Sequence, residues 1–179
     1  MASIEDNRSR MIRLRRAAAG DVPTVHAILA AAAEDLAARF GPGHWSTVSS
    51  IEALRNYASD GVLFVVVAGV AAVGTLRLTD SKIGFYHNEW FAHPGDDAAY
   101  LLDMAINPDS QRRGIGRRSM ALAEDAARLL GSKALRLDAY EGRAGAGEFY
   151  RKCGYSLVHK SAFRGVALEY FEKLLTDGP

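Results

Sequence analysis

The sequence has a single cysteine, Cys153, and it lacks a long hydrophobic run. One cysteine excludes an intrachain disulfide and a structural zinc site built on several thiolates, which favours a reducing compartment. The longest apolar stretch, residues 62–73, covers about a dozen positions and falls short of the roughly 20 that a membrane-spanning helix needs. We therefore expect a cytoplasmic protein with no membrane partner.

An excess of charge of one sign is also missing. The 22 Lys and Arg residues are balanced by 21 Asp and Glu residues, which leaves a formal net charge of +1. This balance provides no general attraction to nucleic acid, and we expect no nucleic-acid partner. RNA binding through Arg13–Arg16 and the arginines at 112, 113, 117 and 118 is a weaker alternative, because no aromatic-rich binding motif accompanies them.

The histidines lack the spacing of metal ligands, and no cluster of carboxylates compensates, so we predict no metal site. They are His26, His44, His87, His93 and His159.

The chain has 179 residues, of which 49% are apolar, and this size and composition fit one globular domain. Residues 1–10 are polar and lack the apolar segment of a signal peptide, so we expect a flexible extension there. We expect a single domain over residues 11–179, because no change of composition marks a boundary within it.

The first half of the chain predicts an edge strand, two helices and a hairpin. The strand lies around Ile12–Leu14, one helix ends near Arg39, a capping box at Ser49–Glu52 begins the second, and the hairpin joins Val62–Ala68 to Ala71–Thr79. The long irregular span Asp80–Asp97 is expected to form a lid or a partner surface, because such loops are usually functional.

The second half predicts a strand, a helix and a strand, and this order implies a parallel crossover. The ranges are Tyr100–Asn107, Gly114–Leu130 and Ala134–Tyr140. A short helix at Ala144–Lys152 and two strands, Tyr155–Ser161 and Val166–Glu172, follow. Ile115, Leu122, Ala126 and Leu129 form the expected buried stripe of the longer helix. The fold class is therefore α/β with a mixed sheet.

The segment Gln111–Arg117 lies between a predicted strand and a predicted helix. Its two glycines, Gly114 and Gly116, allow backbone N–H groups to approach a ligand closely, and the helix start adds unpaired N–H groups. Nearby arginines supply a local positive field. This combination favours a phosphate or pyrophosphate site, although it fits neither the Walker loop nor a complete dinucleotide fingerprint.

Two motifs together resemble the GNAT superfamily of acyl-CoA dependent N-acetyltransferases. The first is Gln111-x-x-Gly114-x-Gly116 after a strand that ends Met104-Ala105-Ile106, and the second is the later segment Phe149–Tyr155. The resemblance covers about residues 12–174 and implies a mixed, twisted sheet with a bulged central strand and flanking helices.

The resemblance also implies roles for matching positions. The strand backbone would pair with the pantetheine arm, the loop amides would hold the pyrophosphate, and a bulge near Ala105 would direct an N–H at the thioester oxygen. Tyr150 would protonate the departing thiolate. Arg143 replaces a common asparagine and would meet a phosphate or the cofactor entrance. The implied cofactor-binding residues are Met104, Ala105, Ile106, Gln111, Arg112, Arg113, Gly114, Ile115, Gly116, Arg117 and Arg143.

The sequence indicates the residues on the acceptor side of the site less specifically than the cofactor-binding residues. Asp103 and Glu141 are candidates for the general base, with ordinary surface carboxylates as the alternative, and Tyr100 lines the acceptor pocket or packs in the core. The resemblance implies transfer of acetyl from acetyl-CoA to a primary amine by direct attack in a ternary complex, with a small-molecule amine as acceptor. A protein lysine or N-terminus as acceptor, a non-catalytic acyl-CoA sensor and a homodimer stay open.

Overall fold

The computed structural model describes residues 11–175, so the expected extension at residues 1–10 lies outside the described part. The described residues form two compact units. The first unit runs to Arg77 and includes Asp103–Leu122, and the second contains Leu78–Leu102 and the chain from Ala123 onward.

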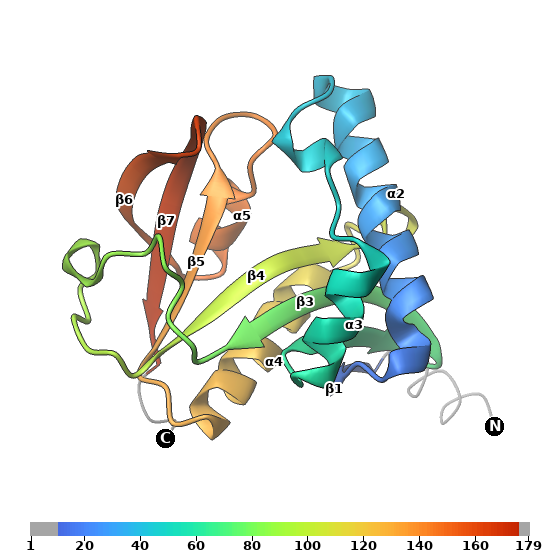
Figure 1. The fold of residues 1–179 in the computed structure, drawn as a ribbon, viewed down its shortest axis with the longest axis horizontal. Coiled ribbons are helices and arrows are strands. Elements are labelled where there is room, and N and C mark those ends of the chain that lie inside the picture. The colour runs from blue at the N-terminus through green and yellow to red at the C-terminus, as the bar shows by residue number, and fades with distance from the viewer. Residues whose placement is uncertain (1–10, 176–179) are drawn as a thin grey trace. The chain divides into compact units, whose positions relative to one another are not determined.

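The first unit contains three antiparallel strands and two helices before the chain leaves it. They are β1 (Ile12–Arg16), α2 (Val22–Phe40), α3 (Ile51–Ser59), β2 (Leu63–Ala68) and β3 (Ala71–Thr79), the last of which continues into the second unit (Figure 1). Strand β1 pairs with β2, and β2 pairs with β3, both antiparallel. The predicted edge strand, helices and hairpin are therefore confirmed.

Helix α3 begins at a different serine from the one that the capping-box spacing indicates. The hydroxyl of Ser50 accepts a hydrogen bond from the Ala53 N–H at 3.2 Å. Ser50 is thus the N-cap, and the box predicted to open at Ser49 was wrong by one position.

Helices pack on both faces of the sheet in the first unit. Val25 of α2 and Leu54 of α3 are buried against Val65 on one face of β2. Ile115 of α4 (Ile115–Leu129) packs with Val66 on the opposite face. This arrangement follows from the alternation of side chains along β2, which is apolar on both sides.

The second half of the chain adds the remaining strands and a short helix. They are β4 (Ala98–Ile106), β5 (Ala134–Tyr140), α5 (Gly147–Lys152), β6 (Ser156–Phe163) and β7 (Val166–Leu174). The sheet has the order β1-β2-β3-β4-β5-β7-β6, and its parallel pair is β4 with β5. The predicted mixed α/β sheet with flanking helices is confirmed.

The buried stripe of α4 differs from the predicted one. Met120, Ala123 and Ala127 are buried, whereas Leu129 is 90% exposed. The packed face of the helix therefore runs through Met120, Ala123 and Ala127, and Leu129 at the helix end lies outside it. The prediction of a stripe through Leu129 was wrong.

Candidate functional site

Strand β4 carries an irregular residue in its second half. Asp103 has a φ of 48°, in the left-handed region that side chains rarely adopt within a strand. Its carboxylate accepts a hydrogen bond from Nε of Arg77 at 2.6 Å. The backbone thus departs from strand geometry at Asp103, two residues before Ala105, near which the resemblance implies a bulge.

The three residues that follow keep an extended course beside β3. Met104 and Ala105 are half-buried, and Ile106 packs into the core cluster of the first unit. Gly74 makes this close approach feasible, since a Cβ there would lie 2.8 Å from the Ala105 carbonyl oxygen.

Gln111 ties the loop after β4 to the strand. Its Nε2 donates a hydrogen bond to the Ile106 carbonyl oxygen at 3.0 Å, while the Asn107 side chain accepts one from the Asp109 N–H. The Asn107 N–H donates to the Val73 carbonyl oxygen at 2.8 Å. The side chain of Gln111 thus contacts protein backbone, and it fixes the start of the glycine-containing loop.

The loop then turns into the first turn of α4. Arg112 and Gly114 both have positive φ, 60° and 77° respectively. The first N–H groups of an α-helix have no partner within the helix, and they carry the positive end of its dipole. The local backbone therefore has the features of an anion-binding loop.

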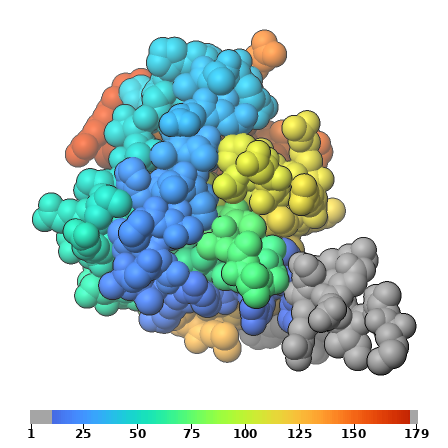
Figure 2. Space-filling view, turned by 90° about the vertical axis from the view of Figure 1, so that its right-hand side faces the viewer, coloured from blue at the N-terminus to red at the C-terminus, as the bar shows by residue number. Residues whose placement is uncertain are grey.

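The arginines around this loop are exposed. They are Arg112, Arg113, Arg117 and Arg118, while Ile115 is buried and Gly116 is half-buried. The turn Pro108–Ser110, directly before this loop, contacts α2, and Figure 2 shows the yellow part of the chain beside the blue part at the surface. Cationic side chains and the exposed backbone of Gly114 therefore occur together in this segment.

Tyr150 lies on α5 in the second unit and is 7% exposed. Its ring contacts Phe149, Tyr155 and Phe171 at centroid distances of 5.3, 6.1 and 5.9 Å. Burial raises the pKa of Tyr150, and the charges of Asp138 and Cys153 raise it further. The phenol is therefore a proton donor throughout the neutral range.

Helix α5 begins at Gly147, later than the predicted start at Ala144. A Cβ at Gly145 would overlap the Tyr140 carbonyl oxygen at 1.6 Å, so the chain needs glycine there to turn before the helix. Arg143 lies in this turn and is exposed.

Two of the residues expected near the acceptor have protein partners in the second unit. Glu141 is exposed and pairs with Nζ of Lys160 at 2.7 Å. Tyr100 is 1% exposed, and its hydroxyl accepts a hydrogen bond from Arg136 at 3.2 Å. Tyr100 is therefore part of the core of this unit, where it contributes packing and a hydrogen bond.

The sequence interpretation missed Asp138. This residue is half-buried on β5, and one of its oxygens accepts a hydrogen bond from the Tyr86 hydroxyl at 2.5 Å. Burial raises the pKa of Tyr86, and the charge of Asp138 adds to this effect. A usable signal existed, because charged residues at two alternate positions of an otherwise apolar strand are unusual.

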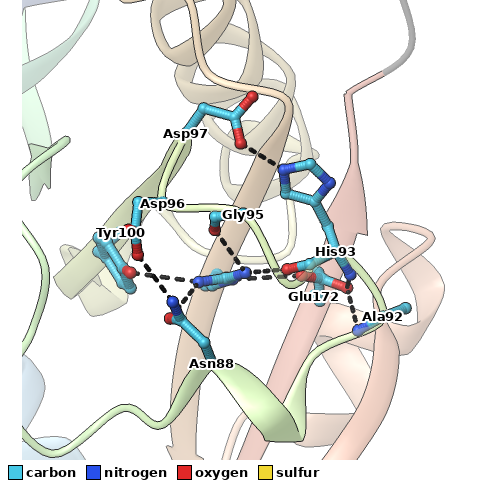
Figure 3. A network of polar contacts seen from close by, with 9 residues as sticks. Asn88, Ala92, His93, Gly95, Asp96, Asp97, Tyr100 and Glu172 are labelled. Carbon is cyan, nitrogen blue, oxygen red and sulfur yellow. Dashed lines mark hydrogen bonds and ion pairs between the residues drawn. The ribbon is translucent and has the colours of Figure 1, made fainter.

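Arg136 is the other charged residue on that strand, and it is fully buried. Figure 3 shows Asn88, His93, Gly95, Tyr100 and Glu172, whose oxygen atoms accept hydrogen bonds from the Arg136 guanidinium. The second oxygen of Glu172 accepts hydrogen bonds from the backbone N–H groups of Ala92 and His93. The cluster therefore fixes residues 88–97 on the sheet.

The irregular span is consequently part of the core and not only a surface loop. Tyr86 is 1% exposed and Phe91 is 6% exposed. Both pack with Tyr170 of β7 in one hydrophobic cluster. The expectation of a lid or partner surface over the whole span was wrong for these two side chains.

Within residues 11–175, no group of His, Cys, Asp and Glu side chains is arranged to hold a metal ion. No helix of this described part is both long and apolar enough to span a membrane.

The acetyltransferase (GNAT) family matches this chain over residues 30–155. Among curated proteins, none matches it in sequence.

Solved structures share the fold at low identity. A GNAT-family acetyltransferase from Streptococcus agalactiae has a TM-score of 0.76 at 14% identity, with 91% of this chain and 95% of that chain covered. The PaiA N-acetyltransferase from Thermoplasma acidophilum, in complex with coenzyme A, has a TM-score of 0.70 at 17% identity, with 92% and 99% covered. The YncA protein from Salmonella typhimurium, with its cofactor acetyl-CoA, has a TM-score of 0.66 at 13% identity, with 94% and 96% covered.

Proposed function

This chain belongs to the acetyltransferase (GNAT) family, and we propose that it transfers the acetyl group of acetyl-CoA to a primary amine of a small molecule. The chain is an acyltransferase, and acetyl-CoA is its acyl donor. The thioester supplies an activated acetyl group, so no protein nucleophile is needed. The amine attacks directly while both substrates are bound.

The observation that carries the proposal is the loop from Gln111 to Arg117. Its residues fit a pyrophosphate, because exposed backbone, positive φ at Arg112 and Gly114, and a helix start occur together. The Gln111 side chain holds this loop to the end of β4. In the proposed complex the loop N–H groups donate hydrogen bonds to the phosphate oxygens, and the arginines add charge.

The backbone of Met104, Ala105 and Ile106 is proposed to pair with the pantetheine arm. The parallel ladder between β4 and β5 consists of Ala98–Tyr100 with Ala134–Arg136, and both strands continue beyond it. Backbone groups of the later part of β4 are the ones assigned to the cofactor. The irregular backbone at Asp103 re-aims the neighbouring N–H groups, one of which is proposed to donate to the thioester oxygen.

Tyr150 is proposed to give its proton to the departing sulfur. Its raised pKa keeps the phenol protonated until the thiolate forms. Arg143, which is exposed in the turn before α5, is proposed to contact the cofactor phosphates or to line the entrance. A cytoplasmic location stays an expectation from the sequence.

The experiment is a screen of primary amines, amino acids and lysine peptides for release of coenzyme A thiol from acetyl-CoA. Transfer to a small amine above the hydrolysis background supports the proposal. Transfer confined to peptides supports a protein acceptor, and binding of acetyl-CoA without transfer to any amine supports a sensor. Mass spectrometry of the product identifies the acetylated nitrogen in each case.

A further inference from the structure

Arg77 of β3 and Asp103 of β4 form an ion pair within the first unit. Nε of Arg77 donates a hydrogen bond to Oδ2 of Asp103 at 2.6 Å, and the two side chains are 19% and 38% exposed. Asp103 is also the residue of β4 that has a positive φ. The ion pair therefore acts at a strand position where the backbone conformation needs support from its surroundings.

Tyr57 orients the guanidinium of Arg77. The central guanidinium carbon lies 4.0 Å from the centroid of the Tyr57 ring. Tyr57 belongs to α3 and packs against the core cluster that contains Val25 and Leu54. Stacking on an aromatic face and bonding to a carboxylate together leave a guanidinium little freedom. Arg77 thus connects this core cluster to the backbone of β4.

Met104, the next residue of β4, is held by separate contacts. Its side chain packs against the core cluster that contains Val66 and Ile115, on the opposite face of the sheet. The peptide between Asp103 and Met104 is therefore fixed at both ends, by the ion pair at one end and by apolar packing at the other. Its orientation is preorganised, because it depends on contacts within the protein.

The positive φ of Asp103 changes the direction of this peptide. A strand residue has a φ of about −120°, so a φ of 48° turns the chain about the N–Cα bond of Asp103 by roughly half a turn. The peptide that follows carries the Met104 N–H, which consequently points away from the direction that a regular strand gives it. This N–H is therefore among the groups that the irregular backbone re-aims.

We infer that Arg77 is a positioning residue for acetyl transfer, which holds the backbone of Asp103 so that the Met104 N–H is directed at the thioester oxygen. This inference rests on the proposed function and assigns its oxyanion donor together with the side chain that aims it. In this assignment the Asp103 carboxylate serves to bond Arg77 and is not the general base.

The donor acts on a charge that exists only during the reaction. The amine nitrogen forms its bond to the acetyl carbon, and an electron pair of the carbonyl moves to the oxygen. This pair returns as the carbon–sulfur bond breaks, the nitrogen releases one proton and the sulfur takes one, which gives the amide and the thiol. A hydrogen bond to the oxygen strengthens in the transition state, so Arg77 should affect kcat more than the affinity for coenzyme A.

The first test compares Arg77→Met with the matched control Arg15→Met. Arg15 of β1 also pairs with an aspartate of the first unit, Asp21, at 2.7 Å, so the control removes an ion pair of the same kind. Loss of an oxyanion donor costs about 10²–10³ in kcat, and we expect about 10- to 100-fold for Arg77→Met, in which the donor is misaligned and not removed. Calorimetry should give an unchanged coenzyme A affinity, and Arg15→Met should keep kcat near the wild-type value.

Variants of Asp103 separate a role of its backbone from a role of its carboxylate. Asp103→Gly removes the carboxylate and adopts positive φ without a steric cost, whereas Asp103→Ala opposes that φ. We therefore expect a higher kcat for Asp103→Gly than for Asp103→Ala. In the Asp103→Gly background, Arg77→Met should lower kcat no further, because no carboxylate remains for the guanidinium to hold.

Isotope-edited infrared spectroscopy of bound acetyl-CoA detects the hydrogen bond directly. A donor to the thioester oxygen lowers the stretching frequency of the labelled carbonyl. We expect this lowering in the wild type and in Arg15→Met, and a return toward the frequency of free acetyl-CoA in Arg77→Met. The measurement needs no acceptor, and it is made below the Tm of each variant, so a loss of stability alone does not move the frequency.

The outcomes distinguish the inference from the proposed function. A carbonyl frequency that is equal in the wild type and in Arg77→Met overturns the inference, and so does a kcat for Asp103→Gly no higher than that for Asp103→Ala. Transfer to small amines with such a frequency keeps the proposed function and refutes the aimed donor. A frequency that depends on Arg77, without transfer to any amine, keeps the donor and refutes the proposed function. Absence of acetyl-CoA binding in the wild type overturns both.

Discussion

Nε of Arg77 lies 2.6 Å from Oδ2 of Asp103, a residue with a φ of 48° inside β4. The Arg77 guanidinium also stacks on the Tyr57 ring, with its central carbon 4.0 Å from the ring centroid. A left-handed residue within a strand costs on the order of 1–3 kcal/mol and persists only where its surroundings hold it. The ion pair and the stacking are the contacts that hold it here.

The first prediction concerns the backbone at Asp103. In an ordinary strand, glycine is less stable than alanine by about 0.5–1 kcal/mol. At Asp103 we expect the reverse order, because glycine adopts positive φ without a steric cost and alanine does not. Urea unfolding of Asp103→Gly and Asp103→Ala measures the difference, and an alanine variant as stable as the glycine variant contradicts it.

The second prediction concerns the anion-binding loop. Among the described residues, no heavy atom lies within 4 Å of a Cβ built at Gly114, so a side chain there has space but must accept a φ of 77°. We expect Gly114→Ala to weaken coenzyme A binding about 10- to 100-fold, because the loop N–H groups lose their alignment with the phosphates. Calorimetry measures this affinity.

Gly20→Ala is the matched control for the loop. Gly20 also has open space around its Cβ position and is not among the glycines with positive φ. Equal coenzyme A affinities for the two variants contradict a pyrophosphate site at Gly114.

The third prediction concerns the buried pair Arg136 and Glu172. Removing one partner leaves an uncompensated buried charge, so Arg136→Met should cost about 3–5 kcal/mol of unfolding free energy. The double variant Arg136→Met/Glu172→Gln should lose less unfolding free energy than the two single variants lose together, by about 0.5–3 kcal/mol. Urea unfolding of the four proteins of this cycle gives both values, and strict additivity rules out the coupling.

Arg39→Met controls for loss of an exposed arginine. Arg39 pairs with Asp35 one helical turn earlier on α2, with 55% of its side chain exposed. Its loss should cost about 0.3–0.5 kcal/mol, because water screens the pair.

The fourth prediction concerns Asp21 at the start of α2. The guanidinium of Arg15 donates two hydrogen bonds to its carboxylate, at 2.7 and 2.8 Å, and lowers the pKa of Asp21 to about 2. The unfolded value is about 3.9, so the stabilisation is complete above about pH 4 and disappears as the pH falls toward 2. The Tm difference between wild type and Asp21→Asn should therefore shrink over that interval.

Arg15→Gln tests the stated cause. It should raise the Asp21 pKa toward its ordinary value, which NMR titration of the carboxyl carbon measures. An Asp21 pKa that stays near 2 in this variant excludes the guanidinium as its main cause.

The order of elements was predictable because local signals decide it. Pro23 near the start of α2, the alternation in β5 and Gly154 after α5 each act over a few residues. The start of α5 was not predictable, because it depends on a turn that leaves no space for a Cβ at Gly145 beside the Tyr140 carbonyl oxygen.

The residues of the candidate site also differ in whether local sequence signals reveal them. Loop glycines and Tyr150 belong to contiguous motifs that a sequence displays. The contact between Tyr86 and Asp138 joins residues 52 positions apart, and only the folded chain brings them together. Tyr100 similarly gains its partner Arg136 from a neighbouring strand, so its buried place could not be told from β4 alone.

The last prediction concerns Tyr150. Burial and the charges of Asp138 and Cys153 raise its pKa, so the phenol stays protonated through the neutral range and donates only when sulfur gains charge. Tyr150→Phe keeps the ring contacts with Phe149 and Phe171 and removes the donor. Positioned proton transfer is worth roughly 10²–10⁴ in rate, so turnover should fall by that factor while coenzyme A affinity is unchanged.

Tyr155→Phe is the control for removal of a buried hydroxyl. The Tyr155 hydroxyl donates a hydrogen bond to Glu124 at 3.2 Å, so this variant should lower the Tm and leave turnover near the wild-type value. The comparison needs an acceptor for which chemistry limits the rate, because slow product release hides an effect on the acid. If Tyr150→Phe then keeps wild-type turnover, Tyr150 is not the acid, and water or another group protonates the sulfur. The interaction strengthens only as the carbon–sulfur bond breaks, so a fall in turnover without a fall in affinity identifies the acid.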